Sequence, residues 1–360
     1  MSIIVVGLSG GVDSSVAAAL LREAGHEVVG ITLRTAPWEE PDEASIRFGS
    51  CCSPTTAGAA RQVARRLGIP YFLLNHEREF GDRVIEDFTR EYGAGRTPSP
   101  CVVCNREIKF GTLLRRALAW EADAVATGHY ARVAPDPRTG RVCLLTARDL
   151  MKDQSYFLWP LSQAQLARAR FPVGGLSKPE VRARAHARRL ATAATPESQE
   201  LCFVNGDYRA FLRARLPEAF RPGPILDEAG HEVGGHGGLG GYTVGQRRGL
   251  GRLGSAPAYV LRLDPSRNAL VVGPREALRA TRLVAEQVNW IALPSLVAPL
   301  EVQARVRHRA PCVAARVRPL DAERVEVTLR EPQYALTPGQ SVVFYRGEVV
   351  VGGGVIASAA

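Results

Sequence analysis

The chain has 360 residues, 46% of them hydrophobic, which is enough for a large core and suggests two or three domains. It is basic, with 46 Lys and Arg against 36 Asp and Glu, and nearly all of the positive charge is arginine. Arginine pairs with phosphate through two parallel hydrogen bonds, so a polyanionic partner is one expectation. A GC-rich genome that favours arginine codons would explain the charge equally well.

The cysteines and the N-terminal residues argue against a secreted or membrane protein. An odd number of cysteines, seven, without a secretion signal is not the pattern of a structural disulfide framework. The start, MSIIVVGLSG, lacks the basic residues and the long apolar stretch of a signal peptide. No run of about 18 apolar residues follows that could span a membrane. We therefore expect a cytoplasmic protein with reduced thiols and no membrane partner.

Strands and helices are predicted to alternate in the first part of the chain. The expected strands are 3–6, 28–33, 70–74 and 124–127, and the expected helices are 13–24, 57–67, 80–92 and 108–120. Continuous apolar runs that end in glycine, such as IIVVG, are typical of buried parallel strands. The alternation predicts an α/β fold, a doubly wound parallel sheet with helices on both faces.

The pattern changes in the second half. Residues 161–190 look helical and are rich in arginine, and 234–241 form a glycine-rich loop. Short alternating segments that predict an antiparallel barrel or sandwich follow at 301–306, 312–317, 324–329, 341–345 and 348–351. We expect a small middle domain before them, so the predicted domains are 1–205, 206–278 and 279–360.

A glycine- and serine-rich segment, GLSGGVDSS at 7–15, lies between the first predicted strand and helix. Gly10 and Gly11 let backbone N–H groups approach an anion, and Ser14 faces it at the helix start. Asp13 is expected to bind Mg²⁺ held by the phosphates. The segment lacks the Walker lysine and resembles the Ser-Gly-Gly-x-Asp-Ser loop of the ATP pyrophosphatases, which cleave ATP to AMP and pyrophosphate. The alternative is an ordinary turn rich in small residues.

Three cysteines suggest sulfur chemistry. Cys101 and Cys104 form a C-x-x-C pair, and Cys202 lies in the segment ESQELCFV. Two thiols that a fold brings together can exchange sulfur or form a transient disulfide. ATP can turn a carbonyl oxygen into a leaving group, after which a persulfide attacks the carbon.

The remaining cysteines leave other interpretations open. Cys51 and Cys52 could complete a four-thiolate zinc site with the C-x-x-C pair, although adjacent cysteines are awkward zinc ligands, and an iron–sulfur cluster is a further alternative. Cys143 and Cys312 lie in apolar surroundings and are expected in strand cores.

Taken together, nine segments resemble the family of tRNA-specific 2-thiouridylases, nearly from end to end of the chain. They are GLSGGVDSS, GRTPSPCVVCNREIKFG, DAVATGHYAR, MKDQSYFLW, FPVGGLSKPEVR, ESQELCFV, GGHGG, TVGQRRGLG and TPGQSVVFY. The family thiolates carbon 2 of the wobble uridine in the tRNAs for Glu, Gln and Lys. The resemblance implies a fold like that of the adenine nucleotide alpha-hydrolases, ATP and Mg²⁺ as cofactors, and tRNA and a sulfur-donor protein as partners. We expect a monomer without a resident metal site.

The resemblance also implies roles for individual residues. Cys104 corresponds to the nucleophile and Cys202 to the persulfide carrier, and the two would join in a transient disulfide. The implied ATP contacts are Gly7, Leu8, Ser9, Gly10, Gly11, Val12, Asp13, Ser14, Leu33 and Gly128. The implied tRNA contacts are Ser99, Pro100, Cys101, His129, Lys152, Asp153, Gln154, Arg307, His308 and Gln340.

Three positions depart from the family pattern. Ser99 replaces the usual Asn, Thr195 replaces the usual Lys, and some members carry Asp where this chain has Cys101. That Asp is a candidate acid or base, so the resemblance assigns no such role here.

Two other classes of function remain. One is a different ATP pyrophosphatase, such as an amidotransferase-type synthetase, which needs an ammonia source and no thiol pair. The other is a non-catalytic tRNA-binding protein, with or without a structural metal.

Overall fold

The computed structural model describes residues 1–36, 53–196, 201–204, 206–254 and 256–359. The chain divides into two compact units, which are described separately. The first unit comprises 1–84, 101–205 and 348–350, and the second unit comprises 85–100, 206–347 and 351–360. Cys51 and Cys52 lie outside the described residues.

The sheet of the first unit consists of parallel strands in the order β3 (Tyr71–Asn75), β2 (Glu27–Arg34), β1 (Ile3–Gly7), β4 (Ala124–Ala126) and β7 (Ala169–Arg170). In the centre, Val5 of β1 lies opposite Val29 on one side and Val125 on the other. The strand order reverses at β1, which gives the sheet a switch point between β1 and β4. Ligands of open α/β sheets bind at such a point, beyond the carboxyl ends of the strands.

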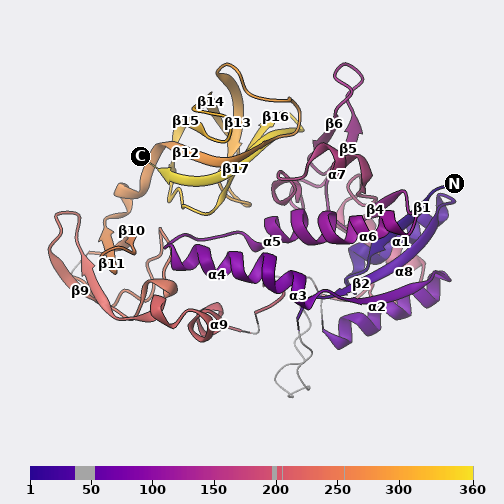
Figure 1. Cartoon of the computed structure of the whole chain (residues 1–360), viewed down its shortest axis with the longest axis horizontal. Helices are drawn as coiled ribbons and strands as arrows, with labels where there is room; N and C mark the ends of the chain where they lie inside the picture. The colour runs from indigo at the N-terminus through magenta and orange to yellow at the C-terminus, as the bar shows by residue number, and fades with distance from the viewer. Residues whose placement is uncertain (37–52, 197–200, 205, 255, 360) are drawn as a thin grey trace. The chain divides into compact units, whose positions relative to one another are not determined.

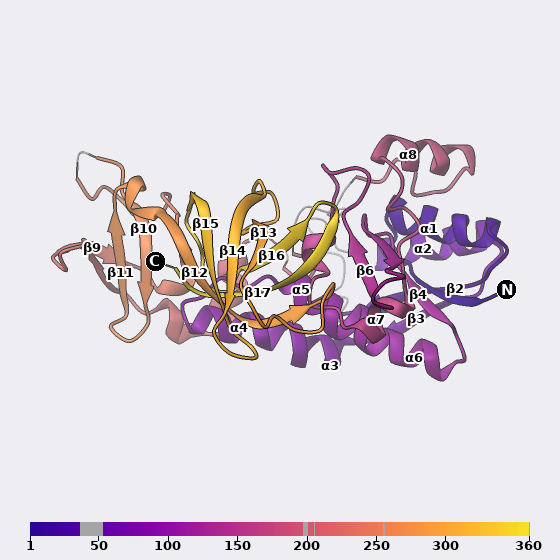
Figure 2. The same ribbon diagram turned by 90° about the horizontal axis from the view of Figure 1, so that it is seen from above.

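Helices cover both faces of this sheet, as the alternating pattern predicted. Helices α1 (Val12–Glu23), α2 (Pro54–Leu67) and α8 (Lys178–Ala187) lie on one face, and α6 (Leu113–Ala119) lies on the other (Figures 1 and 2). Ile4 and Val6 pack against the alanine-rich α1 in a common core. The expected doubly wound fold is therefore confirmed.

The helix expected at 108–120 begins earlier and contains a π-helical segment. It starts as α5 (Pro100–Val103), continues as the π-helix η2 (Cys104–Thr112) and ends as α6. Cys104 is the first residue of the π-helix. Such segments are rare and occur often at functional sites.

The segment 161–190, which was expected to be helical, is helical only in part. The segment contains α7 (Gln163–Arg168), strand β7 and α8. Ser162 and Ser177 each begin a helix with a capping box, and Pro172 cannot continue the first helix. The structure also adds an unpredicted hairpin, β5 (Arg132–Pro135) and β6 (Val142–Leu145), which pairs antiparallel.

The second unit contains a small sheet and a barrel. The sheet has the order β10 (Tyr259–Asp264), β11 (Ala269–Gly273), β8 (Gly223–Leu226) and β9 (Glu232–His236). The barrel has the order β12 (Arg279–Trp290), β15 (Val325–Tyr334), β14 (Val313–Pro319), β13 (Leu300–Arg305), β16 (Ser341–Arg346) and β17 (Val349–Ala359), and β12 closes it by pairing with β17. The expected C-terminal antiparallel barrel is therefore confirmed.

Strand β12 was not among the predicted strands, because its alternation of apolar and polar residues is interrupted. Its register shifts between Ala280 and Arg282 and again between Glu286 and Asn289, and Gln287 has a φ of 52°. Bulges of this kind let a strand turn a barrel corner but break the two-residue period that sequence patterns show.

The remaining elements are short. The helical ones are α3 (Glu77–Phe80), the π-helix η1 (Gly81–Ile85), α4 (Glu86–Gly93) and α9 (Tyr208–Arg215). The 3₁₀ segments are η3 (Ser155–Phe157), η4 (Pro217–Phe220), η5 (Leu239–Gly241) and η6 (Arg275–Leu278). Within the described part of the chain, no helix has the length and apolar character needed to cross a bilayer.

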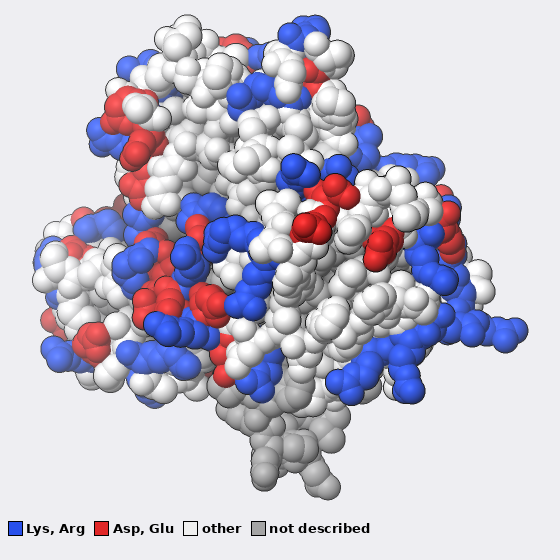
Figure 3. Space-filling view, turned by 45° about the vertical axis from the view of Figure 1, so that its right-hand side comes forward, with Lys and Arg blue, Asp and Glu red and all other residues white. Residues whose placement is uncertain are grey.

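Basic and acidic side chains are mixed on the face of the molecule seen in Figure 3, where Lys and Arg are interspersed with Asp and Glu. Several arginines are held in ion pairs: the Arg96 guanidinium lies 2.7 Å from both Glu91 and Glu286, and that of Arg188 lies 2.6 Å from Glu23. The net charge of the chain therefore does not by itself locate a surface for a polyanion.

The barrel core allows a direct test of the fold. Phe344 is fully buried and stacks on Trp290, with ring centroids 5.7 Å apart. Replacing Phe344 with Ala leaves a cavity, and we expect it to lower the free energy of unfolding by about 3–5 kcal/mol in urea denaturation. Leu320→Ala, at a residue that is 41% exposed, is the control and should change it by less than about 0.5 kcal/mol. Equal effects of the two substitutions would contradict this packing.

Candidate active site

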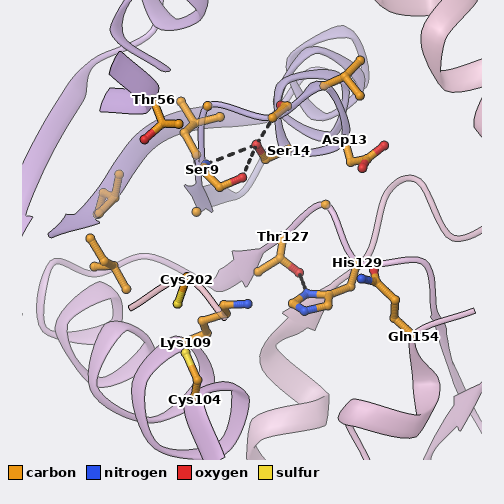
Figure 4. Close-up of a pocket in the computed structure, with 18 of the residues that line it drawn as sticks. Ser9, Asp13, Ser14, Thr56, Cys104, Lys109, Thr127, His129, Gln154 and Cys202 are labelled. Atoms are coloured by element: carbon orange, nitrogen blue, oxygen red, sulfur yellow. Dashed lines mark hydrogen bonds between the residues drawn. The ribbon is translucent and has the colours of Figure 1, made fainter. Parts of the chain in front are cut away.

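A pocket of about 390 Å³ lies in the first unit, beyond the carboxyl ends of β1, β2 and β4. The loop between β1 and α1 forms one wall (Figure 4). The π-helix η2 and the segment around Cys202 form the opposite wall. The pocket therefore occupies the switch point of the sheet, where the topology predicts a ligand.

The β1–α1 loop is shaped by its own hydrogen bonds. The hydroxyl of Ser14 donates to the carbonyl of Gly11 at 3.1 Å and accepts from the N–H of Ser9 at 3.2 Å. Gly10 has a φ of 73°, and a β-carbon there would collide with the backbone of Thr56. Helix α1 then begins without a side-chain cap, so its first N–H groups remain available for an anion.

Gly128 brings the end of β4 against this loop. A β-carbon at Gly128 would overlap the backbone of Asp13 and Ser14. Only glycine allows so close an approach, and the contact closes the pocket at the β1/β4 switch point. Of the other residues expected to bind ATP, Leu33 at the end of β2 also lines the pocket.

Asp13 is engaged by a buried lysine. The ammonium of Lys178 lies 2.8 Å from each carboxylate oxygen of Asp13, and the hydroxyl of Tyr130 donates to the same carboxylate at 2.8 Å. Lys178 is only 7% exposed. A Mg²⁺ ion would have to displace this ammonium, so the arrangement does not fit the expected role of Asp13 as a metal ligand. Mg²⁺ stays a prediction from sequence alone.

His129 is a buried, neutral residue at the end of β4. Burial, and then the positive charge of Lys109, hold the pKa of His129 well below its usual value. Its Nδ1 atom lies 2.6 Å from the hydroxyl of Thr127, which fixes the ring. Neutral imidazole can donate or accept a hydrogen bond in the pocket without carrying charge.

The structure brings Cys104 and Cys202 into the same pocket, although they lie far apart in sequence. Their side chains flank Lys109 in Figure 4.

Cys101 does not line the pocket and is exposed. Packing around its thiol nevertheless raises the pKa of Cys101, and the charge of Lys109 acts in the opposite direction. Cys143 and Cys312, expected in strand cores, are only partly buried.

The expected tRNA contacts of the first unit fall into two groups. His129, Lys152 and Gln154 line the pocket. Asp153 is buried, and its carboxylate accepts hydrogen bonds from the N–H groups of Ala147 and Ser155. Asp153 therefore stabilises the turn that places its neighbours Lys152 and Gln154 at the pocket.

In the second unit, Gln340 lies beside the segment that contains Ser99 and Pro100. Its amide donates to the carbonyl of Thr97 at 2.8 Å, and Thr97 in turn donates its N–H to Pro338. Gln340 thus holds the segment before the C-x-x-C pair.

Arg307 is exposed and donates to the carbonyls of Tyr334 and Ala335, both at 2.9 Å. His308, next to Arg307, is partly exposed.

Sequence reasoning missed several residues of the pocket. The structure adds Thr56, Lys109, Thr127, Tyr130 and Lys178. Lys109 and Lys178 lie inside two of the segments that carry the family resemblance. Within the described residues, no three His, Cys, Asp or Glu side chains are grouped as a metal site. The zinc alternative involving Cys51 and Cys52 lies outside the described residues.

Comparisons with known proteins cover almost the whole chain. Residues 2–206 match the tRNA methyl transferase HUP domain family, 209–274 match the tRNA methyl transferase PRC-barrel domain, and 280–356 match the aminomethyltransferase beta-barrel domain. The tRNA-specific 2-thiouridylase MnmA of Roseiflexus castenholzii is 52% identical over 99% of this chain and 100% of its own length. That of Heliobacterium modesticaldum is 50% identical over 98% of this chain and 92% of its own.

Likeness to solved structures is more distant. A 4-thiouridine synthetase in complex with RNA and bound ATP matches 60% of this chain and 51% of its own, with 17% identity and a TM-score of 0.36. A likeness so slight adds nothing to the argument from sequence relatives.

The close approach at Gly128 allows a test of the pocket. Gly128→Ala should push the end of β4 away from Ser14 and weaken ATP binding by about tenfold or more, which corresponds to about 1.4 kcal/mol. Equilibrium dialysis with labelled ATP measures the change. Gly175→Ala is the matched control, because no atom lies within 4 Å of a β-carbon at Gly175. Unchanged ATP affinity in the Gly128 variant would show that the nucleotide does not bind here.

Proposed function

The chain belongs to the family of tRNA-specific 2-thiouridylases, and we propose that it replaces the oxygen at carbon 2 of the wobble uridine of tRNA with sulfur, using ATP. Following the family, the substrates are the tRNAs for Glu, Gln and Lys. The observation that supports the proposal is one pocket with the glycine- and serine-rich loop before α1 on one wall and two cysteines, Cys104 and Cys202, on the other.

The loop wall suits the activation step. The glycine-rich loop and the uncapped start of α1 would hold the phosphates of ATP, and Leu33 and Gly128 would border the adenosine. The uridine oxygen attacks the α-phosphorus, and pyrophosphate leaves. Carbon 2 then carries an adenylate, which is a far better leaving group than the original oxygen.

The cysteine wall suits sulfur transfer. Cys202, loaded as a persulfide by a sulfur-donor protein, attacks carbon 2 with its outer sulfur, and AMP leaves. The thiolate of Cys104 then attacks the inner sulfur of Cys202. That step breaks the persulfide bond, leaves the outer sulfur on the base and forms a disulfide between Cys104 and Cys202. Two thiols are oxidised as the sulfur is reduced, so a dithiol reductant must reopen the disulfide.

The base must reach this pocket from the anticodon loop. A base of a single-stranded loop can leave its stack at lower cost than a base in a duplex. His129, Lys152 and Gln154 are proposed to contact the target nucleotide, because their side chains line the pocket. Ser99, Pro100, Cys101, Arg307, His308 and Gln340 are proposed as further tRNA contacts, on the family resemblance.

The test is thiolation of tRNA by purified protein. The reaction contains unmodified tRNA, ATP, a dithiol reductant, and free cysteine with a cysteine desulfurase as the sulfur source. We expect 2-thiouridine in the digested tRNA, measured by mass spectrometry of nucleosides. Cys104→Ser and Cys202→Ser should each abolish it while tRNA-dependent release of pyrophosphate continues, because adenylation does not use the thiols.

Cys143→Ser is the matched control, since Cys143 does not line the pocket, and it should keep full activity. Full thiolation by either the Cys104 or the Cys202 variant would contradict the proposed roles. Pyrophosphate release that depends on ammonia, without thiolated product, would instead favour an amidotransferase-type synthetase.

A further inference from the structure

The lysines of this chain are confined to one place. Of its 46 basic residues only three are lysines, at positions 109, 152 and 178, and the other 43 are arginines. All three lysines line the pocket of the first unit, and among the described residues that line it none is an arginine. Every other basic position of the chain is an arginine. The side-chain ammonium groups of the chain are therefore concentrated at this pocket.

Two of the three lysines already have a role. Lys178 holds the carboxylate of Asp13 on the loop wall. Lys152 precedes Asp153 in the segment proposed to meet tRNA. Lys109 lies on the opposite wall, partly buried, and no role follows for it from the nucleotide or from the family resemblance.

The π-helix determines where Lys109 points. In a π-helix the backbone hydrogen bond joins residues five apart, so Cys104 and Lys109 lie on the same side of η2. In a regular α-helix, residues five apart point in different directions. Ile108 and Leu113 line the same pocket, as expected for one face of this helix. The irregular segment thus brings a lysine next to the proposed nucleophile.

The charge of Lys109 acts on this wall of the pocket. It contributes to the lowered pKa of His129, after burial, and it opposes the effect of packing on the pKa of Cys101. In Figure 4 the Lys109 side chain lies between Cys104 and Cys202, with its amine directed into the pocket. The ammonium of Lys109 therefore lies on the wall of the pocket that carries both thiols.

We propose that Lys109 is a positioning residue whose ammonium stabilises the thiolate of Cys104, the group that breaks the persulfide bond. A thiolate, not a thiol, attacks sulfur, and a neighbouring cation increases the thiolate fraction. A sulfur anion presents one atom, whereas the guanidinium fork of arginine suits the paired oxygens of carboxylates and phosphates. The ammonium of Lys109 therefore suits a single sulfur atom, and a guanidinium at the same position would still supply the positive charge. The inference rests on the proposed function.

The experiment measures the reactivity of the thiol in the nucleotide-free protein. Full-length protein is treated with limiting iodoacetamide at neutral pH, and alkylation of Cys104 is followed by peptide mass spectrometry. Lys109→Met should slow it by about tenfold, the change that one pKa unit produces in the thiolate fraction. Lys109→Gln, a second neutral variant, should give the same loss. Lys109→Arg, which keeps the charge, should retain most of the reactivity.

Arg106→Met is the matched control. It removes a positive charge from the same helix, but Arg106 does not line the pocket and its Nε lies 2.8 Å from Glu107. This variant should react like the unmodified protein. In the complete reaction, Lys109→Met should lose 2-thiouridine formation by a similar factor.

Alkylation of Cys104 at the unmodified rate in a folded Lys109→Met or Lys109→Gln protein would overturn the inference. So would a Lys109→Arg variant as slow as Lys109→Met. Failure of the proposed function has a different signature, namely no 2-thiouridine from the unmodified protein, and the alkylation rates decide on Lys109 in either case.

Discussion

The contact on which the site depends is the approach of the β4 end to the β1–α1 loop. Gly128 lies so close to the backbone of Asp13 and Ser14 that no side chain fits between them. This contact joins the two strands on either side of the switch point. It fixes the position of the loop before α1, which forms one wall of the pocket. The residues that follow Gly128 also line the pocket. Thr127 and His129 are held there by their own hydrogen bond, and Tyr130 reaches Asp13 from the next position.

From this contact the chemistry divides between two walls. The loop wall offers backbone N–H groups and serine hydroxyls, with Asp13 neutralised by Lys178. The opposite wall offers two thiols and the ammonium of Lys109. The ion pair neutralises the carboxylate of Asp13 on the loop wall, where a negative charge would repel phosphates, and the ammonium of Lys109 lies on the wall that carries the cysteines. The π-helix η2 contributes to the second wall by turning Cys104 and Lys109 to the same side.

The sequence predicted those parts that local signals encode. Buried strands followed by glycine gave the parallel sheet, and GLSGGVDSS gave the loop between β1 and α1. The family resemblance supplied Cys104 and Cys202, which the fold brings together. Local signals failed where the structure depends on distant partners. Strand β7 has only two residues and is a strand only because it pairs with β4. Lys178 follows its partner Asp13 by 165 residues, so no local pattern reveals the ion pair.

In the proposed reaction the uridine oxygen is adenylated before sulfur replaces it. This order can be followed with tRNA that carries ¹⁸O at carbon 2 of the wobble uridine, in a reaction with ATP and the sulfur source in ordinary water. We expect the AMP released to carry one ¹⁸O atom for each 2-thiouridine formed, because the uridine oxygen leaves with the phosphate. Unlabelled AMP accompanying 2-thiouridine would contradict it.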